Sequence, residues 1–140
     1  PVLVIKNEHS AFEVADFVFA TDFTDECHEP FEAARSFAQF AGAKMHLLYV
    51  NTPSGFKTTS EIYALMRKFV KHVPEKEYTL NIYNDYSVEK GILSFARDHE
   101  AQLIGISTHG RKGLSHFFNG SISEDMVNHA KMPVITFKIP

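Results

Sequence analysis

Short apolar runs alternate with amphipathic stretches along most of the chain. The runs have the length and the apolar content of buried strands, and they fall at residues 16–23, 44–50, 78–84, 102–107 and 133–139. Apolar residues recur every three or four positions between the runs, which predicts helices at 28–42, 58–73, 86–101 and 122–130. A repeated strand–helix alternation is typical of a parallel sheet covered on both faces, so we predict an α/β fold with an open, doubly wound sheet.

Several residues have the chemistry expected at helix ends. Gly42 follows the first predicted helix, where glycine commonly ends a helix. We expect Thr59 or Ser60 to cap the second helix and Ser87 to cap the third. Ligands of open sheets bind beyond the carboxyl ends of the strands, so a site is expected in the loops after residues 20, 50, 83 and 107.

The first and last apolar runs resemble each other. Residues 1–6 read PVLVIK and residues 133–139 read PVITFKI. One interpretation is that residues 1–15 are the closing strand of a preceding, similar domain with its linker, and that residues 16–140 form the domain proper. The other is a coincidence between two strands rich in Val and Ile. An added strand at residues 1–6 would cover a bare sheet edge, either its own or a neighbour's.

Composition narrows the class of protein. The chain has 140 residues, 44% of them hydrophobic and 22% charged, which suits one globular domain. The net charge of -3 argues against a general nucleic-acid binder, and no apolar run approaches the roughly 20 residues that span a membrane. The only cysteine, Cys27, rules out an internal disulfide. We therefore expect a cytoplasmic protein without nucleic-acid or membrane partners.

The stretch 107–123, STHGRKGLSHFFNGSIS, combines glycines, hydroxyls and positive charge after a strand. Gly120 and Ser121 fall where the last predicted helix begins, and the free N–H groups and helix dipole at such a point favour an anion such as phosphate. His109 and Arg111 add positive charge. The alternative is structural, because Ser121 could simply cap the helix, with Glu124 completing a capping box.

Two other loops end at the same edge of the predicted sheet. Thr21 and Asp22 follow the first strand, and the Asp22 carboxylate could accept a hydrogen bond from an exocyclic amine such as that of adenine. Asp22 could equally cap a turn. Val50 closes the second strand, where its backbone could lie along a base edge and its side chain could pack on the ring. Plain burial in the core is the alternative for Val50.

Together these residues resemble the universal stress protein family over residues 16–139. Nucleotide-binding members carry a motif of Gly, two residues, Gly, nine residues, and then Gly-Ser or Gly-Thr. Gly110, the nine residues RKGLSHFFN and Gly120-Ser121 match its later parts. The segments THGRKGL, GSISEDMVNHAKMPV, ATDF and LLYV are also similar to family sequences.

The resemblance implies a five-stranded parallel sheet in the order 3-2-1-4-5 with four flanking helices. It implies ATP as ligand, with or without Mg²⁺, and adenine near Asp22 and Val50. It also implies a homodimer or a tandem-domain pair joined through the last strand, residues 133–139. The predicted nucleotide-binding residues are Thr21, Asp22, Val50, Ser107, His109, Gly110, Arg111, Gly120, Ser121, Ile122 and Ser123.

One position departs from the motif, because its first glycine falls at Ser107. A serine side chain could crowd the phosphates or offer them a hydroxyl. The alternative function is therefore a ligand-free dimerisation module that has lost the nucleotide. A third hypothesis is a phosphoacceptor receiver domain that uses Asp22, although receivers carry the acceptor after the third strand, where Asp85 is isolated.

The sequence contains no dependable catalytic set. Its eight histidines match no zinc pattern, there is no second cysteine, and the glycine loop lacks the Lys-Ser/Thr ending of a Walker motif. No metal ligands are assigned, and any ATP hydrolysis is expected to be slow.

Overall fold

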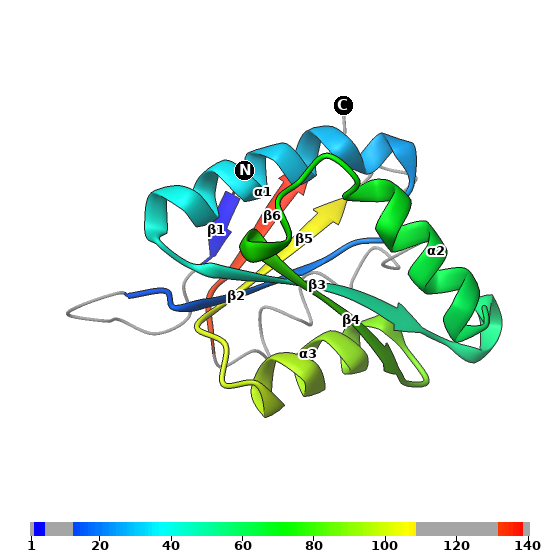
Figure 1. Cartoon of the computed structure of the whole chain (residues 1–140). Coiled ribbons are helices and arrows are strands. Elements are labelled where there is room, and N and C mark those ends of the chain that lie inside the picture. Colours follow the sequence, from blue (N-terminus) through cyan, green and yellow to red (C-terminus); the bar gives the residue numbers. More distant parts are fainter. Residues whose placement is uncertain (1, 5–12, 109–131, 139–140) are drawn as a thin grey trace.

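The computed structural model describes residues 2–4, 13–108 and 132–138, which contribute six strands to a single sheet (Figure 1). Five strands run parallel in the order β4-β3-β2-β5-β6, which is the predicted order 3-2-1-4-5. They are β2 (Asp16–Ala20), β3 (Lys44–Asn51), β4 (Tyr78–Asn84), β5 (Leu103–Thr108) and β6 (Val134–Lys138). The predicted fold class is confirmed.

Helices cover both faces of this sheet. Figure 1 shows α1 (His28–Ala41) and α2 (Thr59–Phe69) on one face and α3 (Val88–Asp98) on the other. The fourth predicted helix, 122–130, lies outside the described residues. No helix in the described part of the chain is both long and apolar enough to cross a membrane.

The observed helix ends agree with the sequence for α1 and α3 but not for α2. Gly42 ends α1 in the left-handed conformation with φ 67°, and Ser87 caps α3 by accepting a hydrogen bond from the N–H of Lys90, both as predicted. The predicted cap of α2 was wrong, because Thr58 takes that place rather than Thr59 or Ser60. Thr58 has Glu61 three residues later, and their side chains form a capping box that neither alternative could make.

The second helix is also shorter than predicted. It ends at Phe69, and Val70 and Val73 continue to pack on the core from the following turn. The apolar residues at helical spacing therefore extend beyond the helix itself, because side chains in the following turn are also buried in the core.

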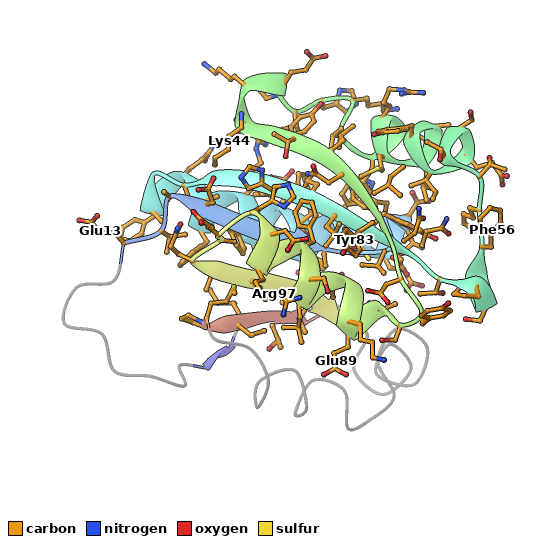
Figure 2. The ribbon with its side chains drawn as sticks, turned by 90° about the horizontal axis from the view of Figure 1, so that it is seen from below. Glu13, Lys44, Phe56, Tyr83, Glu89 and Arg97 are labelled. Carbon is orange, nitrogen blue, oxygen red and sulfur yellow. The ribbon has the colours of Figure 1, made fainter. Side chains whose placement is uncertain are left out.

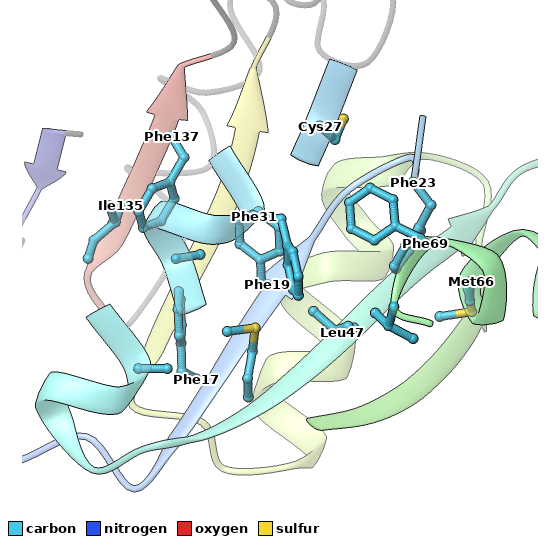
Figure 3. Close-up of a cluster of buried hydrophobic side chains, with 14 of the residues drawn as sticks. Phe17, Phe19, Phe23, Cys27, Phe31, Leu47, Met66, Phe69, Ile135 and Phe137 are labelled. Carbon is cyan, nitrogen blue, oxygen red and sulfur yellow. The ribbon is translucent and has the colours of Figure 1, made fainter. Parts of the chain in front are cut away.

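The two faces of the sheet carry separate apolar cores. Under α1 and α2 lies a cluster rich in aromatic residues, which includes Phe17, Phe19, Phe31 and Phe69 (Figure 3). Under α3 lies a smaller aliphatic cluster that includes Val18, Ile92 and Ile106. Alternate residues of β2 point into each cluster, so this strand is buried on both sides, as a central parallel strand should be.

A sixth strand, β1 (Val2–Val4), lies along β6 and runs antiparallel to it. Val2 is opposite Thr136, Leu3 is opposite Ile135, and Val4 is opposite Val134. The added amino-terminal strand thus covers the edge of its own sheet, which was one of the two arrangements considered from sequence.

Gly105 gives a test of how tightly the aromatic cluster is packed. A Cβ at this position would lie 2.6 Å from two atoms of the Phe17 ring and 3.1 Å from the Phe19 ring. We therefore predict that Gly105→Ala lowers the free energy of unfolding by about 1–3 kcal/mol, the usual cost of overpacking a core. Urea denaturation measures the change.

Gly55→Ala is the matched control, because its Cβ would meet nothing closer than 3.9 Å. We expect this substitution to alter stability by less than about 0.5 kcal/mol. Equal effects of the two substitutions would mean that the close contact at Gly105 is absent.

Candidate nucleotide site at the carboxyl edge of the sheet

All five parallel strands present their carboxyl ends at one edge of the molecule. Figure 2 shows Lys44, which opens β3, at one end of the sheet, and Phe56, which follows the end of β3, at the other. The strand order reverses between β2 and β5, because β3 flanks β2 on one side and β5 flanks it on the other. This is the switch point where doubly wound sheets bind ligands.

A buried hydrogen bond crosses this switch point. The hydroxyl of Ser107, near the end of β5, donates to Oγ1 of Thr21, directly after β2, over 3.0 Å. Ser107 is only 5% exposed, and Thr21 is fully buried. The N–H of Thr21 donates in turn to the carbonyl oxygen of Leu48 on β3. Three adjacent strands are thus joined at the edge where a ligand would sit.

The Asp22 carboxylate organises the next turn. Its Oδ1 accepts hydrogen bonds from the N–H of Thr24 over 3.2 Å, from the hydroxyl of Thr24 over 3.0 Å, and from the thiol of Cys27 over 3.0 Å. This is the turn-capping role that the sequence allowed for Asp22. Within the described part of the chain, its second oxygen, Oδ2, has no hydrogen-bond partner. The described contacts of this turn therefore use only one of the two carboxylate oxygens.

Phe23, beside Asp22, has a left-handed backbone with φ 59°. Such a conformation is strained for a bulky residue and costs roughly 1–3 kcal/mol. Its ring is buried, with the Phe69 ring 5.3 Å away edge-on and the Tyr49 ring 6.3 Å away and stacked. Core packing from α2 and β3 therefore holds the loop in a shape that its backbone would not adopt alone.

Cys27 connects the loop to α1 and is 1% exposed. Burial raises the pKa of its thiol above the ordinary value, hydrogen bonds from Thr21 and Thr24 partly oppose this, and the neighbouring Asp22 raises the pKa further. The sulfur consequently keeps its proton near neutral pH. Cys27 was not among the residues predicted for the candidate site. The five-residue spacing from Asp22 was the available signal, but a single cysteine suggested only the absence of a disulfide.

Val50 is the next-to-last residue of β3, which ends at Asn51, and it is 8% exposed. Its side chain packs on α3, where a Cβ on Gly91 would lie only 2.4 Å from Val50 Cγ1. The side chain is therefore part of the core, as the alternative interpretation expected, and only the backbone of Val50 is left to meet a base. On the other face of β3, Tyr49 has its pKa raised by burial first and by the charge of Asp22 second.

The remaining predicted site residues lie outside the described part of the chain. They are His109, Gly110, Arg111, Gly120, Ser121, Ile122 and Ser123. The structure thus brings together Thr21, Asp22 and Ser107 through direct or shared contacts, with Val50 on the neighbouring strand.

A hollow at this edge is lined by the loops after residues 50 and 83, two of the loops in which the sequence predicted a site. It has a volume of about 610 Å³ and lies beyond β3 and β4, with Asn51 and Asn84 among its lining residues. Phe56 and Tyr86 also line it, and they are 69% and 85% exposed. Among the residues described, no group of three or more His, Cys, Asp or Glu side chains is arranged to hold a metal.

A sequence model of the universal stress protein family matches residues 15–138, almost the whole chain. The chain belongs to the universal stress protein family. This confirms the resemblance found in the sequence. No curated protein is similar enough in sequence to match.

Solved structures of universal stress proteins share the fold. One, in complex with cAMP, is 17% identical, with a TM-score of 0.71 over 91% of this chain and 99% of that one. A universal stress protein from Archaeoglobus fulgidus in complex with dAMP is 18% identical, with a TM-score of 0.57 over 91% and 100%. Another, from Archaeoglobus fulgidus DSM 4304, is 20% identical, with a TM-score of 0.70 over 99% of this chain and 50% of that one.

The bond across the switch point can be tested through stability. We predict that Ser107→Ala lowers the free energy of unfolding by about 0.5–2 kcal/mol, because it removes the buried hydroxyl that donates a hydrogen bond to Thr21. Ser54→Ala is the control at an exposed position, where the expected change is below about 0.5 kcal/mol. Chemical denaturation of both variants measures the difference. A Ser107→Ala variant as stable as the parent would show that this hydroxyl contributes nothing to the edge.

Proposed function

We propose that this universal stress protein domain is a regulatory module that binds an adenine nucleotide, ATP, at the carboxyl edge of its sheet. The observation that carries the proposal is the orientation of Ser107. Its hydroxyl is buried against Thr21, so the residue that departs from the family's motif directs its side chain into the protein. The main objection from sequence, that this side chain would fill the space for phosphate, is thereby weakened.

The loop after β2 supplies the base end of the proposed site. Asp22 is held by three hydrogen bonds on Oδ1, and its other oxygen could accept one from the adenine amine. The backbone of Val50 is proposed to lie along the base. Gly110, Gly120, Ser121, Ile122 and Ser123, with His109 and Arg111, are proposed to hold the phosphates on the strength of the motif, with or without Mg²⁺.

The proposal agrees with what related structures contain. Two universal stress proteins of the same fold were solved with cAMP and with dAMP, which are both adenine nucleotides. Their identity to this chain is below 20%, so they support the ligand class, while the choice of ATP rests on the motif. Any hydrolysis is proposed to be slow, and the protein is proposed to act in the cytoplasm.

Binding of ATP should be visible as thermal stabilisation. A ligand that binds only the folded chain stabilises it by about 2.7 kcal/mol at a hundred times its dissociation constant, which for a domain of this size raises the melting temperature by roughly 5–10 °C. We predict this shift with ATP and Mg²⁺, measured by scanning fluorimetry, and a much smaller one with GTP as control.

The competing function, a ligand-free module, predicts different results. Intact protein would show no shift with ATP, and no nucleotide would copurify with it. A gain of binding from nothing in Ser107→Gly would then mean that the serine has removed an ancestral site.

A specific observation also supports domain pairing through β6. When PVLVIK is aligned with PVITFK, Leu3 corresponds to Ile135, and these two residues lie opposite each other in the antiparallel pair. A strand that pairs with a copy of itself about a two-fold axis has this register. We therefore propose that β1 takes the place of the closing strand of a second domain, in a tandem chain or a homodimer, so that residues 1–15 belong to the preceding domain and 16–140 to this one.

Removing β1 tests the pairing. We predict that the intact chain does not dimerise through the edge of β6. A chain lacking residues 1–6 should dimerise as its concentration rises, because the bare edge of β6 can then pair with another copy. Sedimentation velocity measures the assembly. Adding a PVLVIK peptide should restore the monomer. A truncated chain that stays monomeric would contradict the proposal.

A further inference from the structure

The single cysteine lies against the proposed base-binding loop rather than apart from it. Cys27 ends the short 3-10 helix Asp25–Cys27 and precedes the first turn of α1. Figure 3 shows it at the end of the aromatic cluster nearest the carboxyl ends of β5 and β6. Its sulfur is 3.0 Å from Asp22 Oδ1 and 3.7 Å from the hydroxyl of Ser107. One buried atom therefore contacts both the carboxylate of the loop and the switch-point serine.

The bonds on Asp22 are distributed unevenly between its two oxygens. Oδ1 accepts from the N–H and hydroxyl of Thr24 and from the thiol of Cys27, whereas Oδ2 has no partner among the described residues. Thr24 belongs to an exposed turn, but Cys27 is anchored in the core. Among the described residues, the thiol is thus the donor that ties the carboxylate to the buried core.

The protonation state of the sulfur decides whether this contact is attractive. Burial and the neighbouring Asp22 charge both raise the pKa of Cys27, so near neutral pH the group is a neutral thiol. A thiol donates a hydrogen bond to a carboxylate, whereas a thiolate at 3.0 Å would repel it. The geometry therefore requires the proton that the buried environment retains.

We propose that Cys27 is a positioning residue for recognition of a 6-aminopurine: its thiol fixes Asp22 through Oδ1 so that Oδ2 accepts a hydrogen bond from the exocyclic amine. The inference rests on the proposed function and adds the cause of base specificity. A carboxylate held by a buried donor loses little freedom when the amine binds. An Asp22 released from Cys27 would have to be ordered by the ligand itself.

The test compares two nucleotides that differ only at the base. ATP carries the amine, and purine riboside triphosphate carries hydrogen in its place. We expect the parent chain to bind ATP roughly tenfold or more tightly than the purine analogue, since one hydrogen bond to a charged group has about this effect. Isothermal titration calorimetry measures both dissociation constants.

Variants of Cys27 then separate positioning from packing. Cys27→Ala and Cys27→Val both remove the donor, and Val keeps more of the buried volume, so either one that folds is sufficient. We expect them to reduce the preference for ATP about threefold to tenfold and to change the affinity for the purine analogue less than about twofold. Cys27→Ser keeps a donor and is expected to retain most of the preference.

A pH profile gives an independent reading. The thiol proton is present below the raised pKa of Cys27 and is lost above it. The preference of the parent chain for ATP should therefore decline only above the ordinary thiol pKa of about 8.5, while Cys27→Ser, which has no thiol, keeps its preference over that range.

Each other result overturns the inference in a distinct way. If the parent binds neither nucleotide, the proposed function fails and the inference fails with it. If it binds both equally, nucleotide binding stands and recognition of the amine through Asp22 is wrong. If Cys27→Ala and Cys27→Val weaken both nucleotides to the same extent, or neither, the thiol only packs and does not position Asp22.

Discussion

Strand β2 is buried on both faces of the sheet, and the rest of the described structure takes its position from that constraint. Its residues alternate between the aromatic cluster under α1 and α2 and the aliphatic cluster under α3, and no residue from Phe17 to Ala20 is more than 1% exposed. A strand that is buried on both faces can reach solvent only at its ends. The chain therefore becomes polar abruptly at Thr21 and Asp22, at the edge where the flanking strands also end.

Ser107 departs from the family motif, and its role follows from the residues that it contacts in the fold. In the sequence it is a serine in place of a glycine, and the two obvious consequences both concern phosphate. In the fold its hydroxyl faces Thr21 and the sulfur of Cys27 on the side of α1. The residue contributes to the joint between β5 and β2, and the predicted strand order alone did not show that its side chain points toward Thr21.

The sequence was sufficient for features that depend on local pattern or on the alternation of elements. Gly42 and Ser87 were predicted because each follows from short-range chemistry, whereas the strand order was implied by the family resemblance. The cap of α2 was missed because three consecutive hydroxyl residues, Thr58, Thr59 and Ser60, offered the same chemistry, and only Glu61 distinguishes them. Cys27 was missed for another reason: its contact with Ser107 joins residues that the sequence separates by eighty positions.

The left-handed backbone of Phe23 has a consequence beyond the loop itself. Its shape is maintained by the rings of Phe69 and Tyr49, which belong to α2 and β3. The geometry at Asp22 is therefore coupled to side chains of α2 and β3. Substitutions in the face of α2 that packs on Phe23 would therefore change the shape of this loop, although the residues of the loop itself stay unchanged.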